Sequence, residues 1–169
     1  MSDEQLQRRF RNLLLKGTRA LQAGEMETAV RLLERATQLL PSHVDAQLNL
    51  SGAYILTKQF KKAAAVLELA ATLDPENAMI WTNLGAAYLG NPILAKEEEQ
   101  QRAIEAFERA LSLNPVAPNV AYNIGLIYRD KQDHSAALHW FQRALHANPQ
   151  DKDARYYVGV MEEKIKSEK

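Results

Sequence analysis

Three groups of polar residues have the side-chain types that enzymes and metal sites use. The first group is Ser42, His43 and Asp45, the types of a nucleophile, a base and an orienting carboxylate. Residues this close along the chain cannot form a line from nucleophile to base to carboxylate. Ser42-x-x-Asp45 follows Pro41 directly and matches a capping pattern at the start of a helix. We therefore interpret this segment as a helix start and not as a hydrolase site.

The second group consists of His134, His139 and His146, which fall on one expected helix. Zinc ligation from a single helix needs spacings of three or four residues, whereas a separation of seven places side chains about 10 Å apart. The third group, residues 97–99, is three consecutive glutamates, and consecutive helical side chains point about 100° apart. The sequence also has no glycine-rich phosphate loop. We expect no catalytic residue, no metal site and no cofactor.

Composition restricts the partners that we expect. The 169 residues include 21 Lys and Arg, 21 Asp and Glu and no cysteine, and neither half of the chain has the basic excess that nucleic acids require. Residues 77–95 carry no charge, but Gly and Pro at 90–92 interrupt them, so a buried helix and a turn are favoured over a membrane span. The N-terminus has no long apolar run typical of a signal peptide. We expect a cytoplasmic protein that binds neither nucleic acid nor membrane.

The sequence repeats itself. Four prolines, Pro41, Pro75, Pro115 and Pro149, are separated by 34, 40 and 34 residues, and each follows an apolar pattern of helical period. Counted back from each proline, with six extra residues allowed in the third unit, five positions hold the same class of residue. These five columns are Gly17, Ser51, Gly85 and Gly125; Ala20, Tyr54, Tyr88 and Tyr128; Ala29, Ala63, Ala103 and Ala137; Leu33, Leu67, Phe107 and Phe141; and Ala36, Ala70, Ala110 and Ala144.

The third unit carries the motif Trp81-x2-Leu84-Gly85-x2-Tyr88, followed by Ala103-x3-Phe107 and Pro115. In these residues the chain resembles the tetratricopeptide repeat family. The resemblance implies an all-α, right-handed superhelix of antiparallel helix pairs, with repeats at about 10–43, 44–77, 78–117 and 118–151 in a single domain of residues 1–169. The small residues of the columns allow close helix contacts, and an apolar stripe in residues 152–167 predicts a solvating end helix. We expect nine helices in all.

Two local features concern the ends of helices. Ser2-x-x-Gln5 predicts a capping box that opens an extended first helix. The six-residue insertion lies near residues 90–101, where Pro92 is expected to begin a new element and residues 97–99 to lie at a helix N-terminus. We expect a longer turn there, and about one and a half extra turns on the second helix of this repeat.

The resemblance also implies that the first helix of each repeat lines a concave groove. Asn49, Asn83 and Asn123 occupy the same register on that face, and a carboxamide can both donate to and accept from the backbone of an extended peptide. These asparagines could instead bridge neighbouring helices. Only Arg11 and Arg129 are basic at groove positions, so we do not expect a clamp for a peptide carboxylate. The other residues that we expect to contact a peptide are Leu14, Leu15, Leu48, Tyr122, Leu126 and Tyr157.

The leading hypothesis is therefore a non-catalytic adaptor or scaffold that binds a peptide segment of a partner protein in its concave groove. The exposed leucines at groove positions favour a contact surface, although burial under the first helix would explain them equally well. A second hypothesis is a structural module that self-assembles through its ends, and we expect a monomer or a weak homo-oligomer. A third, an RNA-binding helical repeat, is disfavoured by the neutral charge.

Overall fold

A computed structural model describes residues 2–92 and 94–168 of the chain, and in these ranges it contains nine helices and no strand. This confirms the expected all-α class. The helices form four consecutive antiparallel pairs, followed by one end helix. Their bounds are α1 (Asp3–Gln22), α2 (Met26–Leu39), α3 (Val44–Leu56), α4 (Phe60–Leu73), α5 (Ala78–Leu89), α6 (Glu97–Leu113), α7 (Val120–Asp130), α8 (His134–Ala147) and α9 (Lys152–Ser167).

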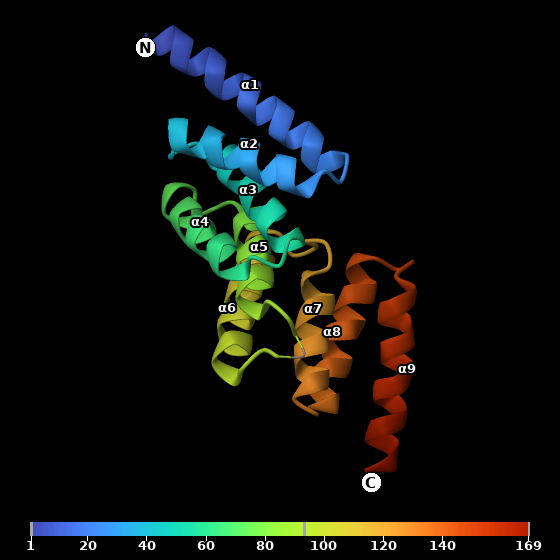
Figure 1. Cartoon of the computed structure of the whole chain (residues 1–169). Coiled ribbons are helices and arrows are strands. Elements are labelled where there is room, and N and C mark those ends of the chain that lie inside the picture. Colours follow the sequence, from blue (N-terminus) through green and yellow to red (C-terminus); the bar gives the residue numbers. More distant parts are fainter. Residues whose placement is uncertain (1, 93, 169) are drawn as a thin grey trace.

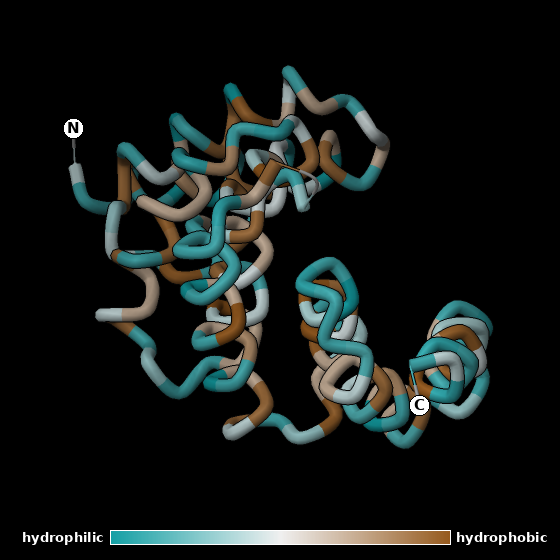
Figure 2. The backbone as a smooth tube through the Cα atoms, turned by 90° about the horizontal axis from the view of Figure 1, so that it is seen from below, coloured by the Kyte–Doolittle hydropathy of each residue, from teal (hydrophilic) through white to brown (hydrophobic). Residues whose placement is uncertain are grey.

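Each helix packs mainly against the helices next to it in sequence, so the molecule is a right-handed superhelix of stacked pairs. Figure 1 shows α1 at one end, across the top of α2, and α9 at the other end, beside α8. Seen from below, the N-terminus and the C-terminus lie on opposite sides of the molecule (Figure 2). None of the helices in the two described ranges combines the length and apolarity needed to cross a bilayer.

The glycine column marks the points where the two helices of a pair meet most closely. A Cβ atom at Gly17 would lie 2.8 Å from Cγ of Leu33, and one at Gly125 would lie 2.8 Å from Cδ1 of Phe141. Leu33 and Phe141 are fully buried, and the alanines of the two alanine columns are buried as well. The columns therefore describe the core contacts of each pair, as the sequence predicts.

The capping prediction is right for the first helix and wrong for the third. At α1 the Ser2 hydroxyl accepts from the Gln5 backbone amide at 3.2 Å, and the Gln5 side chain accepts from the Ser2 amide at 3.0 Å. At α3 the N-cap is His43, which makes no side-chain cap bond. The backbone amide of His43 donates to the Leu40 carbonyl at 3.2 Å, so the chain is still in a turn at this point. Asp45 lies in the first turn of α3, where the helix dipole favours its charge.

The insertion adds more turn and less helix than expected. The other pairs are joined by the three-residue links 23–25, 57–59 and 131–133, whereas α5 and α6 are joined by residues 90–96, among which residue 93 lies outside the described part. The helix α6 has 17 residues and the other second helices have 14, so the gain is less than one turn. Pro92 begins no helix. The amide of Lys96 donates to the Glu99 carboxylate at 2.8 Å, and this cap fixes the start of α6 at Glu97, with residues 97–99 in its first turn.

A departure from the repeat motif keeps its hydrogen bond. The indole Nε1 of Trp81 donates to the carbonyl oxygen of Pro75 at 2.8 Å. Gln47 stands at the Trp81 position of the second repeat, and its Nε2 donates to the carbonyl oxygen of Pro41 at 2.5 Å. Gln47 is almost fully buried. Both side chains thus satisfy the carbonyl of the proline six residues before them, where the preceding helix has ended.

Candidate peptide-binding groove

Side chains of α1, α3 and α5 line a hollow that is open to solvent and has a volume of about 480 Å³. We call it the α1–α3–α5 hollow. It lies on the first helices of three successive repeats, the elements that line the concave groove in the sequence-based expectation. Because residues one helical turn apart share a face, each helix contributes side chains at spacings of three or four. The lining residues are Arg11, Leu14, Leu15, Thr18, Asp45, Leu48, Asn49 and Met79.

The hollow has an apolar floor and an exposed apolar rim. Leu14 and Leu48 are half-buried and pack against the main core. Leu15 is 52% exposed and Met79 is 61% exposed, so both present apolar surface to solvent. Apolar side chains that gather around a concavity, rather than scatter singly, are typical of contact surfaces. Burial under α1 does not cover this set, since Leu15 of α1 is itself exposed.

The three asparagines differ in their hydrogen bonds. Asn49 donates from Nδ2 to the Thr18 hydroxyl at 3.0 Å and so links α3 to α1. The carboxamides of Asn83 and Asn123 are half-buried and make no hydrogen bond to any residue of the described ranges. Asn49 therefore does bridge two helices, while Asn83 and Asn123 leave both a donor and an acceptor open to a ligand.

The remaining expected contact residues lie in a different cluster, near the C-terminus. The ring centroids of Tyr122 and Tyr157 are 6.2 Å apart, and each ring also packs against the buried Phe141, at 5.6 and 4.9 Å. Leu126 packs against the same cluster. Burial, and then the neighbouring Tyr157, raises the pKa of the Tyr122 hydroxyl above its ordinary value. The structure thus joins Tyr122, Leu126 and Tyr157 to one another but not to the α1–α3–α5 hollow.

Two charged groups at groove positions have different environments. Arg129 donates to Asp130 at 2.5 Å and to the Tyr157 hydroxyl at 2.8 Å, so its guanidinium is already engaged within the protein. Arg11 makes only a long bond, 3.4 Å, to the carbonyl of Gln7 in its own helix. Arg11 therefore remains open to a ligand in the hollow.

Asp45 and Met79 line the hollow but are absent from the set expected from the sequence. Each stands two residues before the Trp81 position of its repeat, and Arg11 has the same register in the first repeat. The repeat register alone could have identified them. With Arg11 and Asp45 both present, the hollow offers one positive and one negative group beside its apolar surface.

His134, one of the three histidines of α8, contacts a carboxylate. His134 lies 2.6 Å from the Glu168 carboxylate, a contact that ties α8 to the end of α9. Among the described residues, no group of three or more His, Asp or Glu side chains is arranged to hold a metal ion.

Two models of the tetratricopeptide repeat match the chain, over residues 20–87 and 93–152. The chain is 29% identical to the general transcriptional corepressor trfA of Dictyostelium discoideum, over 62% of this chain and 7% of that protein. It is 28% identical to the peroxisomal targeting signal receptor of Candida albicans, over 56% of this chain and 16% of that protein. The chain thus spans only a small part of these curated relatives.

Solved structures with the same fold cover most of the chain. A crystal structure of MamA is 26% identical and superimposes with a TM-score of 0.75, covering 88% of this chain and 83% of that one. A MamA fragment from Desulfovibrio magneticus RS-1 is 25% identical with a TM-score of 0.73, covering 85% and 77%. A thermophilic tetratricopeptide repeat protein of Thermus thermophilus, 21% identical with a TM-score of 0.71, covers 88% and 79% and shows the shared fold. With its repeat columns, its paired helices and these matches, the chain belongs to the tetratricopeptide repeat family.

Proposed function

We propose that the protein is a non-catalytic adaptor that holds an extended peptide segment of a partner protein in its concave groove, with the α1–α3–α5 hollow as the main contact. The observation that carries the proposal is the exposed apolar rim of this hollow, formed by Leu15 and Met79 over a floor of Leu14 and Leu48. The peroxisomal targeting signal receptor, one relative of this chain, is by its name a receptor for a targeting signal. Family membership supports a role in protein interaction here.

The lining of the hollow indicates which peptide would fit. The apolar side chains of the peptide rest on Leu15, Leu48 and Met79. The peptide backbone pairs with the open carboxamides of Asn83 and Asn123 farther along the groove. Arg11 and Asp45 favour a segment of mixed charge over a strongly acidic or basic one. Tyr122, Leu126 and Tyr157 form the far end of the same surface in this proposal.

The test starts with peptides selected from a random display library on the intact chain, whose affinities are then measured by isothermal titration calorimetry. The double variant Leu15→Glu with Met79→Glu places two charges on the rim, and we expect it to weaken binding by more than tenfold, because each apolar contact is worth about 1.5–3 kcal/mol. The matched control is Leu73→Glu with Val116→Glu, two exposed apolar residues outside the hollow. Equal affinity of the two double variants would disprove the groove as the binding site.

A second arm addresses the asparagines. Asn83→Ala with Asn123→Ala removes two carboxamides that make no hydrogen bond to the residues the structure describes, so the fold is expected to remain intact. Two neutral hydrogen bonds are worth about 1–3 kcal/mol together, so we expect affinity to fall by roughly 5- to 150-fold. Asn49 is kept in this variant, because its loss would also break the bond to Thr18. Light scattering over a concentration series separates peptide binding from self-assembly through the ends of the superhelix.

A further inference from the structure

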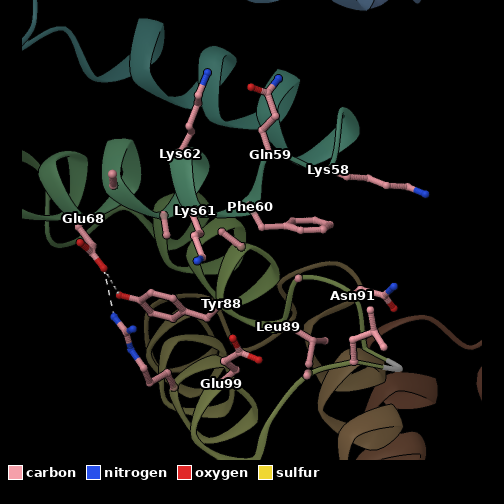
Figure 3. A pocket seen from close by; sticks show the side chains of 17 residues that line it. Lys58, Gln59, Phe60, Lys61, Lys62, Glu68, Tyr88, Leu89, Asn91 and Glu99 are labelled. Atoms are coloured by element: carbon pink, nitrogen blue, oxygen red, sulfur yellow. Dashed lines mark hydrogen bonds and ion pairs between the residues drawn. The ribbon is translucent and has the colours of Figure 1, made fainter.

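A second cavity, of about 770 Å³, lies at the six-residue insertion, and we call it the insertion cavity (Figure 3). Its walls come from the turn between α3 and α4, the first turns of α4, the end of α5, the inserted segment and the first turns of α6. It shares no lining residue with the α1–α3–α5 hollow. Its size falls within the range of ligand-binding pockets, about 300–1,000 Å³.

One wall of the insertion cavity is apolar, and the position of its Phe60 ring depends on the absence of a side chain at Gly90. This residue has φ 56°, which favours glycine, and a Cβ atom added to it would lie 3.3 Å from Cδ2 of Phe60. The Phe60 ring therefore packs over Gly90, where the inserted segment leaves α5. Leu89 is buried at the base of this wall, and Leu94 of the insertion is 74% exposed at its rim. An exposed leucine and a half-buried phenylalanine that line the same cavity present apolar surface to solvent.

Among the described residues that line the insertion cavity, the charged groups without an ion-pair partner carry a net positive charge. The side chains of Lys58 and Lys61 are exposed and make no ion pair or hydrogen bond with the residues that the structure describes. Figure 3 shows Lys58 extending beside Phe60, and Lys61 pointing toward Tyr88.

The other charged groups of the wall have partners. Lys62 lies 4.0 Å from the Glu34 carboxylate, and Arg102 lies 3.1 Å from Glu68. Glu99 accepts from the backbone amide of Lys96 at 2.8 Å. Glu99 keeps its negative charge, because a neutral backbone amide does not cancel it. The two lysines outnumber this one carboxylate, so the charge that a ligand meets is positive on balance.

We propose that the insertion cavity is a second interaction surface, which binds a peptide segment of a partner protein that carries a bulky apolar side chain flanked by Asp or Glu. The apolar side chain seats against Phe60, Leu89 and Leu94, and the carboxylates pair with Lys58 and Lys61. An apolar anchor in a pocket with a charged rim is the arrangement that concentrates binding energy and sets specificity at protein interfaces. The rim residues Lys58, Lys61 and Leu94 are all exposed, so a side chain presented by another protein can enter.

The probe is the hexapeptide acetyl-Glu-Asp-Trp-Leu-Asp-Glu-amide, titrated into the intact ¹⁵N-labelled chain at physiological salt. We expect amide signals of residues 58–65 and 89–91 to shift, and signals of the α1–α3–α5 hollow to stay. Two further probes, one with serines in place of the apolar pair and one with lysines in place of the acids, are expected to bind at least tenfold more weakly.

The decisive variant is Lys58→Glu with Lys61→Glu, which is expected to weaken binding of the acidic probe by about tenfold or more, because attraction becomes repulsion. Its matched control is Lys164→Glu with Lys166→Glu, two exposed lysines of α9 that change the net charge equally and are expected to leave affinity unchanged. Leu94→Ser, at an exposed position, is expected to weaken binding without affecting the fold.

Equal affinities of the two lysine variants would overturn the proposal. So would loss of probe binding in the groove variant Leu15→Glu with Met79→Glu but not in the Lys58 and Lys61 variant, because the probe would then occupy the groove. Dimers that form without probe and disappear in the Lys58 and Lys61 variant, with no probe binding, would identify a second copy of the chain as the occupant and also reject the proposal. The groove and the insertion cavity have no lining residue in common, so either proposal can fail alone.

Discussion

The ring of Phe107 occupies the space that a side chain at Gly85 would need. A Cβ atom built on Gly85 would lie 2.5 Å from Cδ1 and Cε1 of Phe107, which is closer than non-bonded carbon atoms approach in real structures. Both residues are buried, Phe107 completely, and the close packing of protein interiors leaves little volume into which such a ring could turn. The glycine of this column is therefore required by the contact between α5 and α6.

Replacing Gly85 by alanine is expected to lower the free energy of unfolding by about 1–3 kcal/mol, because the added methyl group overpacks a filled core. The matched control is Gly52→Ala in α3, where no atom lies within 4 Å of the added Cβ. Alanine is the better helix former, so this control is expected to raise stability by up to about 1 kcal/mol. Urea unfolding followed by circular dichroism measures both. Equal effects of the two substitutions would show that helix propensity, and not the Phe107 contact, decides the outcome.

The repeat columns predicted the fold because they record contacts that every repeat must make. The side chains that differ between repeats were harder to predict. Asn49, Asn83 and Asn123 share one register, yet in the described part of the chain only the Asn49 side chain makes a hydrogen bond. The residue that meets it in the preceding repeat is Thr18, whereas the equivalent positions for the other two are Gly52 and Ala86, which have no side-chain acceptor.

The structure of the insertion could be predicted from the sequence only in part. Its six extra residues were countable from the proline spacing, but their division between turn and helix depended on the Lys96–Glu99 cap and on the conformation of Gly90. The insertion cavity depends in turn on the Phe60 ring over Gly90. The Phe60–Gly90 contact joins segments about thirty residues apart, so no local pattern encodes it.

The asparagine register leads to a prediction about stability. Removing the Asn49–Thr18 bond, by Asn49→Ala or Thr18→Val, is expected to lower the free energy of unfolding by about 0.5–1.5 kcal/mol. Asn83→Ala and Asn123→Ala are expected to change it by less than about 0.5 kcal/mol, since these carboxamides bond to no residue of the ranges 2–92 and 94–168. Chemical denaturation of the four single variants measures the differences. A loss at Asn83 as large as at Asn49 would mean that both asparagines bridge helices.

The turns inside three of the helix pairs share a residue with a positive φ angle. Gly24, Lys58 and Gln132 are equivalent in the repeat register, and their φ angles are 78°, 59° and 60°. Glycine adopts this region without strain, whereas residues with a Cβ atom do so at a cost of about 1 kcal/mol or more.

Gly24→Ala is therefore expected to destabilise the protein by about 1 kcal/mol, although no atom lies within 4 Å of the added Cβ. Gln132→Gly is expected to stabilise it by a smaller amount, because glycine also gains entropy in the unfolded chain. Thermal unfolding of the two variants measures the effects. A neutral Gly24→Ala variant would contradict the expected strain.

The last prediction concerns pH and the hydrogen bond between Tyr54 and Glu34, which joins two repeats. The Tyr54 hydroxyl donates to Glu34 Oε1 at 2.6 Å, and the tyrosine is only 5% exposed. Burial, followed by this bond to a carboxylate, raises the pKa of Tyr54 well above its ordinary value of 10, since a buried phenolate beside Glu34 would be strongly disfavoured. Burial and then Glu68 raise the pKa of Tyr88 in the same way in the next repeat.

Because the pKa of Tyr54 is higher in the folded chain, the unfolded chain loses its proton first as the pH rises. Stability from this group is complete below pH of about 10 and declines above it. Tyr54→Phe is expected to lower the free energy of unfolding near pH 8 by about 1.5–3 kcal/mol, the value of a hydrogen bond to a charged group, and to flatten the decline above pH 10. Tyr156→Phe, at a residue that is 66% exposed, serves as the control and is expected to change neither. Urea unfolding between pH 8 and pH 11.5 tests this, and a decline in Tyr54→Phe as steep as in the parent would show that other groups cause it.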